Sequence, residues 1–257
     1  MFEKVLIIAK NKDEKEYILK SKIKEYLGYK EIEIIELSEV KKDFINNFDL
    51  IITFGGDGTF VKAANLIEDC FILGINSRPK TSEGALTTIN VNEIDKLKKI
   101  QEENYEILTR ERIKVKLNGR ALDEHSLNEI YIGAQFQFHI SRYKIKFKGK
   151  EEEHRSSGII VSTGTGSPAW FYSAGGKIFA HDEEKLSFIV REPYFGKRIF
   201  KPTILNGDLK KGEILTIKSE KDYGGIIAIN ESIYDFNKGD IVEIELYDKP
   251  LKSIKII

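Results

Sequence analysis

The sequence predicts an α/β N-terminal domain with a parallel sheet, followed by a mostly β C-terminal domain. In about the first hundred residues, short apolar runs alternate with charged segments of helical periodicity, as in parallel strands joined by helices. From Tyr105 onward the runs become short and alternating, and turn residues separate them. We therefore expect one domain over residues 1–104 and a second over residues 105–257.

The elements of the first part follow from its apolar runs. Strands are predicted at 5–9, 31–37, 49–54 and 71–75. Helices are predicted at 13–27, 60–67 and 90–104. The first helix has one apolar stripe, formed by Tyr17, Ile18, Ile23 and Leu27, and the last is capped by Asn90 or Asn92. In such a sheet, ligands bind beyond the carboxyl ends of the strands.

The second part reads as a series of short strands. Asn118-Gly119 is a strong hairpin signal, because both residues tolerate the positive φ of a tight turn. The predicted strands lie at 112–117, 120–122, 127–132, 140–147, 159–162, 186–190, 214–218, 225–229, 241–246 and 253–257.

Composition narrows the class of protein. Lys plus Arg and Asp plus Glu balance at 41 each, so no overall basic field indicates nucleic acid. No apolar run approaches the roughly 20 residues of a membrane span, and the first strand leaves no room for a signal peptide. A cytoplasmic location is therefore expected. The single cysteine, Cys70, lies in an apolar stretch and is expected to be a buried structural thiol.

The segment Gly55-Gly56-Asp57-Gly58-Thr59 directly follows the predicted strand 49–54. Its glycines permit positive φ and let backbone N–H groups approach a ligand, and the helix that follows favours anions at its N-terminus. A carboxylate at Asp57 needs a reason inside such an anion-friendly turn, and action on a hydroxyl or metal beside bound phosphates supplies one. An Asp-Gly β-turn is the alternative, which this density of glycine disfavours.

Two further segments carry candidate chemistry. Thr163–Trp170 is a loop rich in glycine and hydroxyl groups, followed by Ser173-Ala174-Gly175-Gly176. Pro168 suits the first turn of a short helix, and Trp170 could stack on a base or sugar, although a plain loop with Trp170 in the core explains the segment equally well. The adjacent amide and carboxylate of Asn128-Glu129 could hold an adenine edge and ribose hydroxyls, but alone this pair is a weak signal.

Together, and in this order, the three segments resemble the NAD kinase family over almost the whole chain. The family pattern is a Gly-Gly-Asp-Gly-Thr loop, an Asn-Glu pair, and a Thr-x-Thr-Gly-Ser-x-Ala-Tyr loop that ends in Ser-Ala-Gly-Gly. The first motif also occurs in lipid kinases and 6-phosphofructokinases, so the other two make the match specific. Three departures from the bacterial pattern resemble the mitochondrial-type branch and its prokaryotic relatives: the segment 76–84, Ser157 in place of an aspartate, and Trp170 in place of tyrosine.

The resemblance implies an ATP-dependent kinase that phosphorylates the adenosine 2′-hydroxyl of NAD to give NADP. Asp57 is implied as the catalytic residue, and Mg²⁺ would arrive with ATP; no residue is assigned as a metal ligand. The implied phosphate-binding residues are Gly55, Gly56, Gly58 and Thr59. The implied NAD-binding residues are Asn128, Glu129, Thr165, Ala169, Trp170 and Ser173.

Two rival functions remain at this point, another small-molecule or lipid kinase of the same superfamily and a non-catalytic dinucleotide sensor. Four cations are candidates for phosphate binding or for ordinary surface charge: Arg78, Lys80, Arg155 and Arg198. A homodimer is expected from the resemblance and from the alternating aromatics, which could equally fill the protein's own core: Phe136, Phe138, Tyr143 and Phe147.

Overall fold

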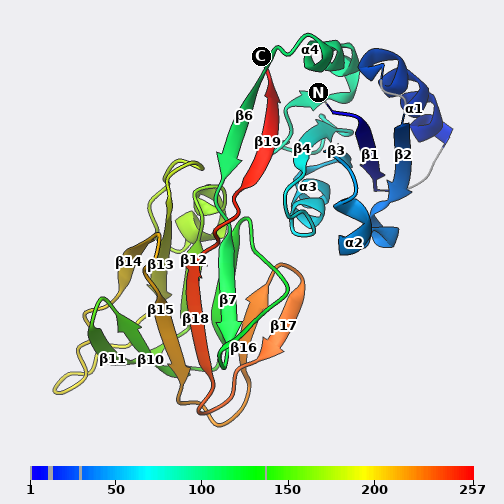
Figure 1. The fold of residues 1–257 in the computed structure, drawn as a ribbon. Coiled ribbons are helices and arrows are strands. Elements are labelled where there is room, and N and C mark those ends of the chain that lie inside the picture. The colour runs from blue at the N-terminus through cyan, green and yellow to red at the C-terminus, as the bar shows by residue number, and fades with distance from the viewer. Residues whose placement is uncertain (1, 11–13, 29–30, 137) are drawn as a thin grey trace. The chain divides into compact units, whose positions relative to one another are not determined.

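The computed structural model describes residues 2–10, 14–28, 31–136 and 138–257, and the chain forms two compact units (Figure 1). The first comprises Met1–Arg110 and Leu251–Ile257, and the second comprises Glu111–Pro250. The predicted fold class is confirmed, with a largely parallel α/β sheet in the first unit and antiparallel strands in the second. The predicted division at residue 104 differs from these units, because β6 (Tyr105–Arg110) pairs with β19 (Leu251–Ile256) in the first unit's sheet.

The sheet of the first unit has the order β2-β1-β3-β4-β19-β6, with the short strand β5 (Ile89–Asn90) beside β4. Its parallel strands are β1 (Lys4–Ala9), β2 (Glu31–Glu36), β3 (Leu50–Gly55) and β4 (Phe71–Asn76). Strand β19 runs parallel to β4 and antiparallel to β6. The strands β1 to β4 lie within one or two residues of their predicted positions, because β1, β3 and β4 are apolar toward both faces of the sheet and the edge strand β2 alternates glutamate with isoleucine.

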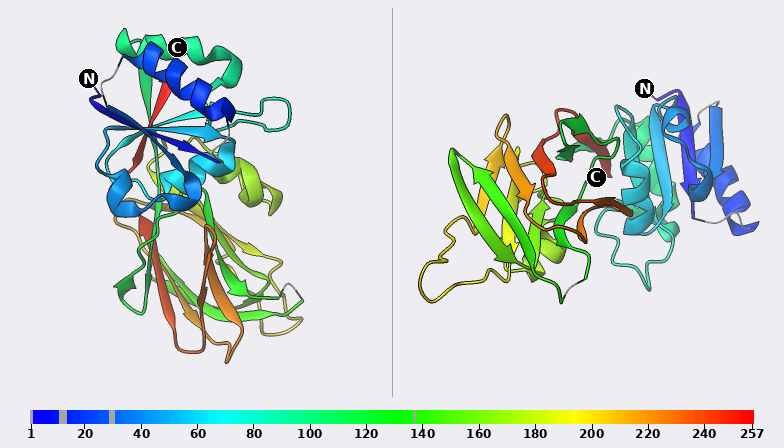
Figure 2. Two further views of the ribbon diagram at one scale, coloured as in Figure 1. Left: turned by 90° about the vertical axis from the view of Figure 1, so that its right-hand side faces the viewer. Right: turned by 90° about the horizontal axis from the view of Figure 1, so that it is seen from below.

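Helices cover both faces of this sheet (Figure 2). One face carries α1 (Glu14–Leu27) and the pair η2 (Val91–Leu97) and α4 (Lys98–Gln101), and the other carries α2 (Lys42–Ile45) and α3 (Asp57–Ala64). A single turn, η1 (Leu37–Glu39), follows β2. The core beneath α1 is aliphatic and includes Val5, Ile7, Ile23, Leu27 and Leu97.

The outcomes for the predicted helices differ. Asp13 lies outside the described residues, and so do the side chains of Tyr17 and Ile18, whereas Ile23 and Leu27 are buried as expected. The predicted helix 90–104 consists of two short helices, and Glu93 has non-helical backbone angles. Asn90 is the N-cap, and it forms a reciprocal capping box with Glu93.

The second unit contains two six-stranded antiparallel sheets that enclose one hydrophobic core. The first sheet consists, in spatial order, of β11 (Lys150–Ser156), β10 (Ser141–Phe147), β15 (Leu215–Ser219), β18 (Ile241–Leu246), β7 (Ile113–Leu117) and β8 (Arg120–Ala121). The second consists of β14 (Asn206–Lys210), β13 (Lys185–Arg191), β12 (Gly158–Ser162), β9 (Glu129–Ala134), β16 (Gly225–Ile229) and β17 (Ser232–Asp235). A single helical turn, η3 (Ser167–Phe171), follows β12.

The predicted Asn118-Gly119 hairpin is confirmed, since Asn118 has φ 52°, Gly119 has φ 76°, and Leu117 pairs with Arg120 across the turn. Of the four aromatic residues considered for a dimer contact, Tyr143 is buried and Phe147 packs against the unit's own core, whereas Phe136 and Phe138 are exposed. No helix in the described parts of the chain is both long enough and apolar enough to span a membrane.

Candidate active site

The predicted phosphate turn joins β3 to α3 in the first unit. Gly56 is the N-cap, with an extended backbone, and Asp57 is the first residue of the helix. None of its three glycines has the positive φ that the sequence suggested, and close packing explains Gly55 instead. A Cβ at Gly55 would lie 2.1 Å from Oγ1 of Thr59, whereas a Cβ at Gly58 would meet nothing within 4 Å. Gly58 therefore leaves open space that the protein itself does not fill.

The carboxylate of Asp57 is held in place by backbone amides of the loop after β4. Its Oδ1 accepts a hydrogen bond from the N–H of Leu86 at 2.8 Å, and its Oδ2 accepts one from the N–H of Ala85 at 3.1 Å. Each carboxylate oxygen has a second lone pair, so the group can still accept a proton or a hydrogen bond from a substrate hydroxyl. The two bonds fix the direction in which Asp57 projects from the helix terminus.

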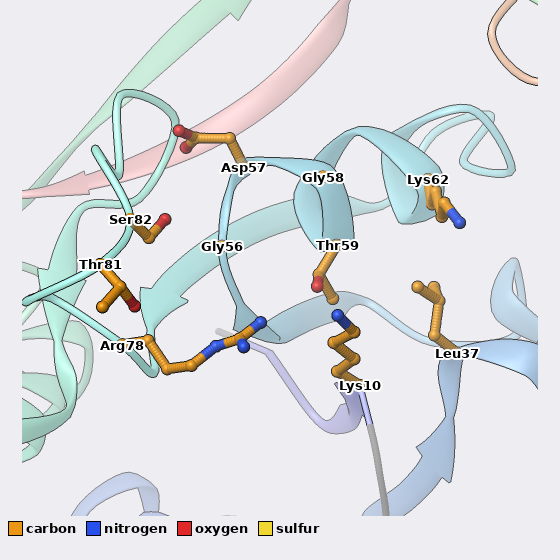
Figure 3. A pocket seen from close by; sticks show the side chains of 10 residues that line it. All are labelled: Lys10, Leu37, Gly56, Asp57, Gly58, Thr59, Lys62, Arg78, Thr81 and Ser82. Carbon is orange, nitrogen blue, oxygen red and sulfur yellow. The ribbon is translucent and has the colours of Figure 1, made fainter.

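A cavity of about 560 Å³ lies beside the turn, within the first unit. Three cations line it, Lys10, Lys62 and Arg78, together with the hydroxyl groups of Thr59 and Thr81. Lys10 and Arg78 extend toward the turn, and Asp57 projects toward the opposite side of it (Figure 3). Positive side chains next to a helix N-terminus make this cavity suited to an anion such as a chain of phosphates.

The other cavity-lining residues are Leu37, Gly56, Asp57, Gly58 and Ser82. Sequence reasoning named Arg78 among its candidate cations but missed Lys10 and Lys62. Lys10 could have been found, because it directly follows β1, which pairs with β3 in the parallel sheet. Carboxyl ends of neighbouring parallel strands meet at one edge of a sheet, so a residue just beyond β1 lies near the end of β3. Lys80 is exposed and does not line the cavity.

In the second unit the structure brings the two remaining motifs together. The backbone N–H of Thr163 donates to the carbonyl of Asn128 at 2.9 Å, and Thr163 Oγ1 donates to the carbonyl of Leu127 at 2.5 Å. Gly166 packs directly on Asn128, since an added Cβ would lie 2.4 Å from the Asn128 carbonyl oxygen. The Asn-Glu pair and the loop after β12 therefore form one local structure.

The loop itself is fixed by its own hydroxyl groups. Ser167 Oγ donates to the carbonyl of Gly164 at 2.9 Å and accepts from the N–H of Phe179 at 3.1 Å. Pro168 stands in the first turn of η3, as predicted. The result is a surface on which Ala169, Trp170 and Ser173 are exposed and Thr165 is half-buried. Trp170 is 39% exposed, which excludes the alternative that it fills the core.

Glu129 is a half-buried carboxylate that lies on β9, opposite Ser162 of β12. Its Oε2 is enclosed and has no hydrogen-bond partner among the described residues. Burial raises the pKa of the Glu129 carboxyl group above its usual range. An enclosed acceptor without a donor costs free energy, which a ligand hydroxyl or amine could recover by donating to it.

The other residues considered in the sequence include two candidate phosphate-binding cations, Arg155 and Arg198, and the single cysteine. Arg155 packs over the ring of Phe200, with 5.4 Å between its guanidinium carbon and the ring centroid, and Arg198 is exposed. Cys70 is buried, as predicted, and burial raises the pKa of its thiol to about 11, so it is an inert thiol. Among the described residues, no group of three or more His, Cys, Asp or Glu side chains could hold a metal ion.

An α/β unit with a Gly-Gly-Asp-Gly-Thr turn beside a cationic cavity is typical of a class of small-molecule and lipid kinases. Comparison with known proteins identifies the family within that class. Residues 3–117 match the model of the ATP-NAD kinase N-terminal domain. The NAD kinase of Clostridium botulinum (strain Alaska E43 / Type E3) is 30% identical over 263 residues, which cover 97% of this chain and 89% of that protein. A probable NADH kinase of Oryza sativa subsp. japonica is 28% identical over 82% of this chain and 71% of its own length.

Solved structures share the fold. A crystal structure of an NAD kinase from Archaeoglobus fulgidus in complex with ATP superposes with a TM-score of 0.75 at 24% identity, over 98% of this chain and 94% of that one. A yeast NADH kinase complexed with NADH gives a TM-score of 0.79 at 18% identity, over 99% and 84% of the two chains. The chain belongs to the NAD kinase family, as its three motifs indicated. Its place in the mitochondrial-type branch stays a prediction.

Proposed function

We propose that this chain is an NAD kinase, an enzyme that transfers the terminal phosphoryl group of ATP to the adenosine 2′-hydroxyl of NAD and so produces NADP. Family membership over nearly the whole chain supports this activity. The observation that carries the proposal is the carboxylate of Asp57, oriented by two backbone amides beside a cationic cavity. Such an arrangement suits phosphoryl transfer, which depends on positioning and charge neutralisation more than on covalent chemistry.

The donor phosphates would lie in the cavity of the first unit. Lys10 and Arg78 would neutralise their negative charge, and the N-terminus of α3 would add its dipole. Gly55, Gly56, Gly58 and Thr59 would let the backbone approach the phosphates closely. Mg²⁺ would arrive with the nucleotide, where it would neutralise phosphate charge.

Asp57 would accept a hydrogen bond from the 2′-hydroxyl and align its oxygen with the phosphorus. Because the transition state of phosphoryl transfer is loose, alignment by a fixed carboxylate contributes at least as much as proton abstraction. The amides of Ala85 and Leu86 would keep the carboxylate in that direction during the reaction. As the proton leaves the hydroxyl, one of the remaining Asp57 lone pairs would receive it.

The acceptor dinucleotide would be bound by the second unit. The enclosed Oε2 of Glu129 would accept hydrogen bonds from ribose or adenine donors, and the amide of Asn128 would complete the contact with the adenosine. The exposed side of the following loop would line the pocket, through Thr165, Ala169, Trp170 and Ser173.

Incubation of the purified protein with NAD, ATP and Mg²⁺, followed by mass spectrometry, tests the function directly. Formation of NADP and ADP in equal amounts is the expected result. Phosphorylation of a lipid or another small alcohol without NADP would favour the other kinases of the superfamily. Binding of NAD without turnover would favour a sensor. Parallel reactions with NADH compare the two redox states, since named relatives include both NAD kinases and a probable NADH kinase.

We further propose that the active enzyme is a homodimer in the cytoplasm. The exposed Phe136 and Phe138 support an oligomer, because two exposed neighbouring rings, 5.7 Å apart at their centroids, are the kind of surface that a partner subunit covers. A closed two-fold assembly is the commonest arrangement of soluble homo-oligomers. Light scattering at micromolar concentration is expected to give twice the chain mass, and a monomeric mass with full activity would exclude the dimer.

A further inference from the structure

Trp170, the chain's single tryptophan, contacts two side chains that come from different strands. The guanidinium carbon of Arg191 lies 5.3 Å from the centroid of the indole ring. The ring of Tyr131 lies 5.5 Å from the same indole, at an interplanar angle of 35°. Tyr131 belongs to β9 and Arg191 to β13, which are the two neighbours of β12 in the sheet. The indole therefore contacts side chains from both sides of the central strand.

Backbone carbonyl groups and two glycines hold the Tyr131 ring in place. Its hydroxyl group lies 2.7 Å from the carbonyl oxygen of Ser157 and 3.0 Å from that of Ala134. A Cβ at Gly133 or at Gly158 would lie within 2.6 Å of Tyr131 side-chain atoms, so both glycines make room for it. Gly158 also has φ +114°, a conformation that other residues rarely adopt. Tyr131 is thus fixed on several sides independently of its contact with Trp170.

The backbone of Arg191 is also fixed. It pairs with Gly158 in the antiparallel register of β12 and β13, and its carbonyl accepts a hydrogen bond from the N–H of Ser157 at 3.0 Å. Its guanidinium forms an ion pair with the neighbouring Glu192, at 3.3 Å, and the Glu192 side chain is 63% exposed, so solvent weakens that pair. The attraction between the guanidinium and the indole face is consequently the contact that acts on Trp170.

We propose that Arg191 is a positioning residue, which together with Tyr131 holds the Trp170 indole as a preformed platform for a flat heteroaromatic ring of the dinucleotide. The inference rests on the proposed function, because Trp170 shares its loop with Thr165 and Ser173. A ring that is already ordered loses little conformational freedom when a ligand stacks on it, so preorganisation strengthens binding. Arg191 does not need to touch the ligand for this effect.

A double-mutant cycle separates this role from direct contact with the ligand. The four proteins are wild type, Arg191→Met, Trp170→Leu and the double variant, and calorimetry measures the dissociation constant of NAD for each. Arg191→Met is expected to weaken NAD binding about three- to tenfold, the scale of one cation–π contact. In the Trp170→Leu background the same change is expected to have no further effect. An equal loss in both backgrounds would overturn the proposal.

Three further readouts distinguish positioning from a general structural role. Arg191→Met is expected to raise KM for NAD and leave KM for ATP and kcat within about twofold, and Arg191→Lys, which keeps a cation, is expected to restore most of the affinity. Without ligand, the emission anisotropy of the single tryptophan is expected to fall in Arg191→Met. Unchanged anisotropy together with unchanged affinity would overturn the proposal.

Lys148→Met is the matched control, since it removes a cation 5.1 Å from the Phe147 ring in the same unit. It is expected to leave NAD binding unchanged, and a loss equal to that of Arg191→Met would overturn the specific role of Arg191. Repeating the cycle with ADP-ribose and with nicotinamide mononucleotide shows which ring stacks on the platform. If wild type binds and converts NAD and Arg191→Met does so equally well, this inference alone fails. If wild type does not bind NAD, the proposed function fails with it.

Discussion

Gly58 of the first glycine-rich loop and two glycines of the second serve opposite purposes. At Gly58, in the turn of the first unit, an added Cβ would meet nothing within 4 Å. In the loop of the second unit, a Cβ at Gly164 would lie 1.9 Å from the carbonyl oxygen of Ala180, and one at Gly166 would lie 2.4 Å from that of Asn128. The first glycine leaves space for something outside the chain, whereas the other two leave space for the chain's own backbone. Glycine content alone therefore does not identify a binding loop.

The largest effect is expected from a substitution of Asp57, because it tests whether the first loop acts in the chemical step and the second in NAD binding. Asp57→Asn should keep the fold and most of the NAD affinity while lowering kcat by roughly 10²–10⁴, the usual scale for a proton-transfer or aligning group. Steady-state kinetics with both substrates measure this, with circular dichroism as the control for folding. Turnover within a few-fold of wild type would remove Asp57 from the mechanism.

Glu129→Gln tests the Asn128-Glu129 pair, which packs against the glycine-rich loop of the second unit. The substitution should raise KM for NAD about tenfold to a hundredfold, because a hydrogen bond to a charged group is worth about 1.5–3 kcal/mol. KM for ATP should change little, since the cavity that would hold the phosphates lies within the first unit. An unchanged KM for NAD would reduce Asn128-Glu129 to an ordinary strand dipeptide.

The pH dependence of KM for NAD is a further test of the role of Glu129 in binding. Because burial raises the pKa of Glu129, its carboxylate should take up a proton at a higher pH than an exposed glutamate does, and KM for NAD should rise as the pH falls through that value. The linkage to folding has the opposite sign, since a raised pKa means that the folded state binds the proton more tightly and is relatively more stable at low pH. In Glu129→Gln the inflection in KM should disappear, and its persistence would assign it to another group.

Substituting alanine for one glycine of each loop tests the comparison itself. Gly166→Ala should destabilise the protein by about 1–3 kcal/mol, because the new methyl group meets a backbone carbonyl that cannot move aside. Gly58→Ala should instead stabilise the protein by about 0.4–1 kcal/mol, because α3 gains a better helix former in open space. Denaturant unfolding measures both, and destabilisation of equal size by the two variants would contradict the distinction.

The fold was largely predictable from sequence because most of its strands are apolar on at least one face. Strand β11 is one exception, since its sequence Lys-Glu-Glu-Glu-His-Arg-Ser carries little apolar pattern. It forms because it pairs with β10 in a register that places Glu153 opposite Lys144 and Glu151 opposite Lys146. Strand β10 directly precedes it, and Lys148 (φ 48°) and Gly149 (φ 78°) form the two-residue turn between them, so the hairpin indicates β11 where the strand's own apolar pattern does not.

The candidate site was predictable where a short motif carried it and not where the sheet assembled it. Asp57 and Glu129 both stand within recognisable segments. Arg191 does not, because its relation to Trp170 depends on the pairing of β13 with β12. The orienting amides of Ala85 and Leu86 are equally hidden, since any residue can provide a backbone N–H group.

Strand β19 has a consequence for how the protein is made. It lies between β4 and β6 in the sheet of the first unit, and it contributes the buried Leu251 and Ile254. A ribosome synthesises it only after the whole of Glu111–Pro250. The edges of β4 and β6 that pair with β19 therefore remain unpaired while the second unit emerges and begins to fold. Nascent chains arrested before Leu251 should be more sensitive to protease within residues 1–110 than the released protein, although they contain every residue of the phosphate turn.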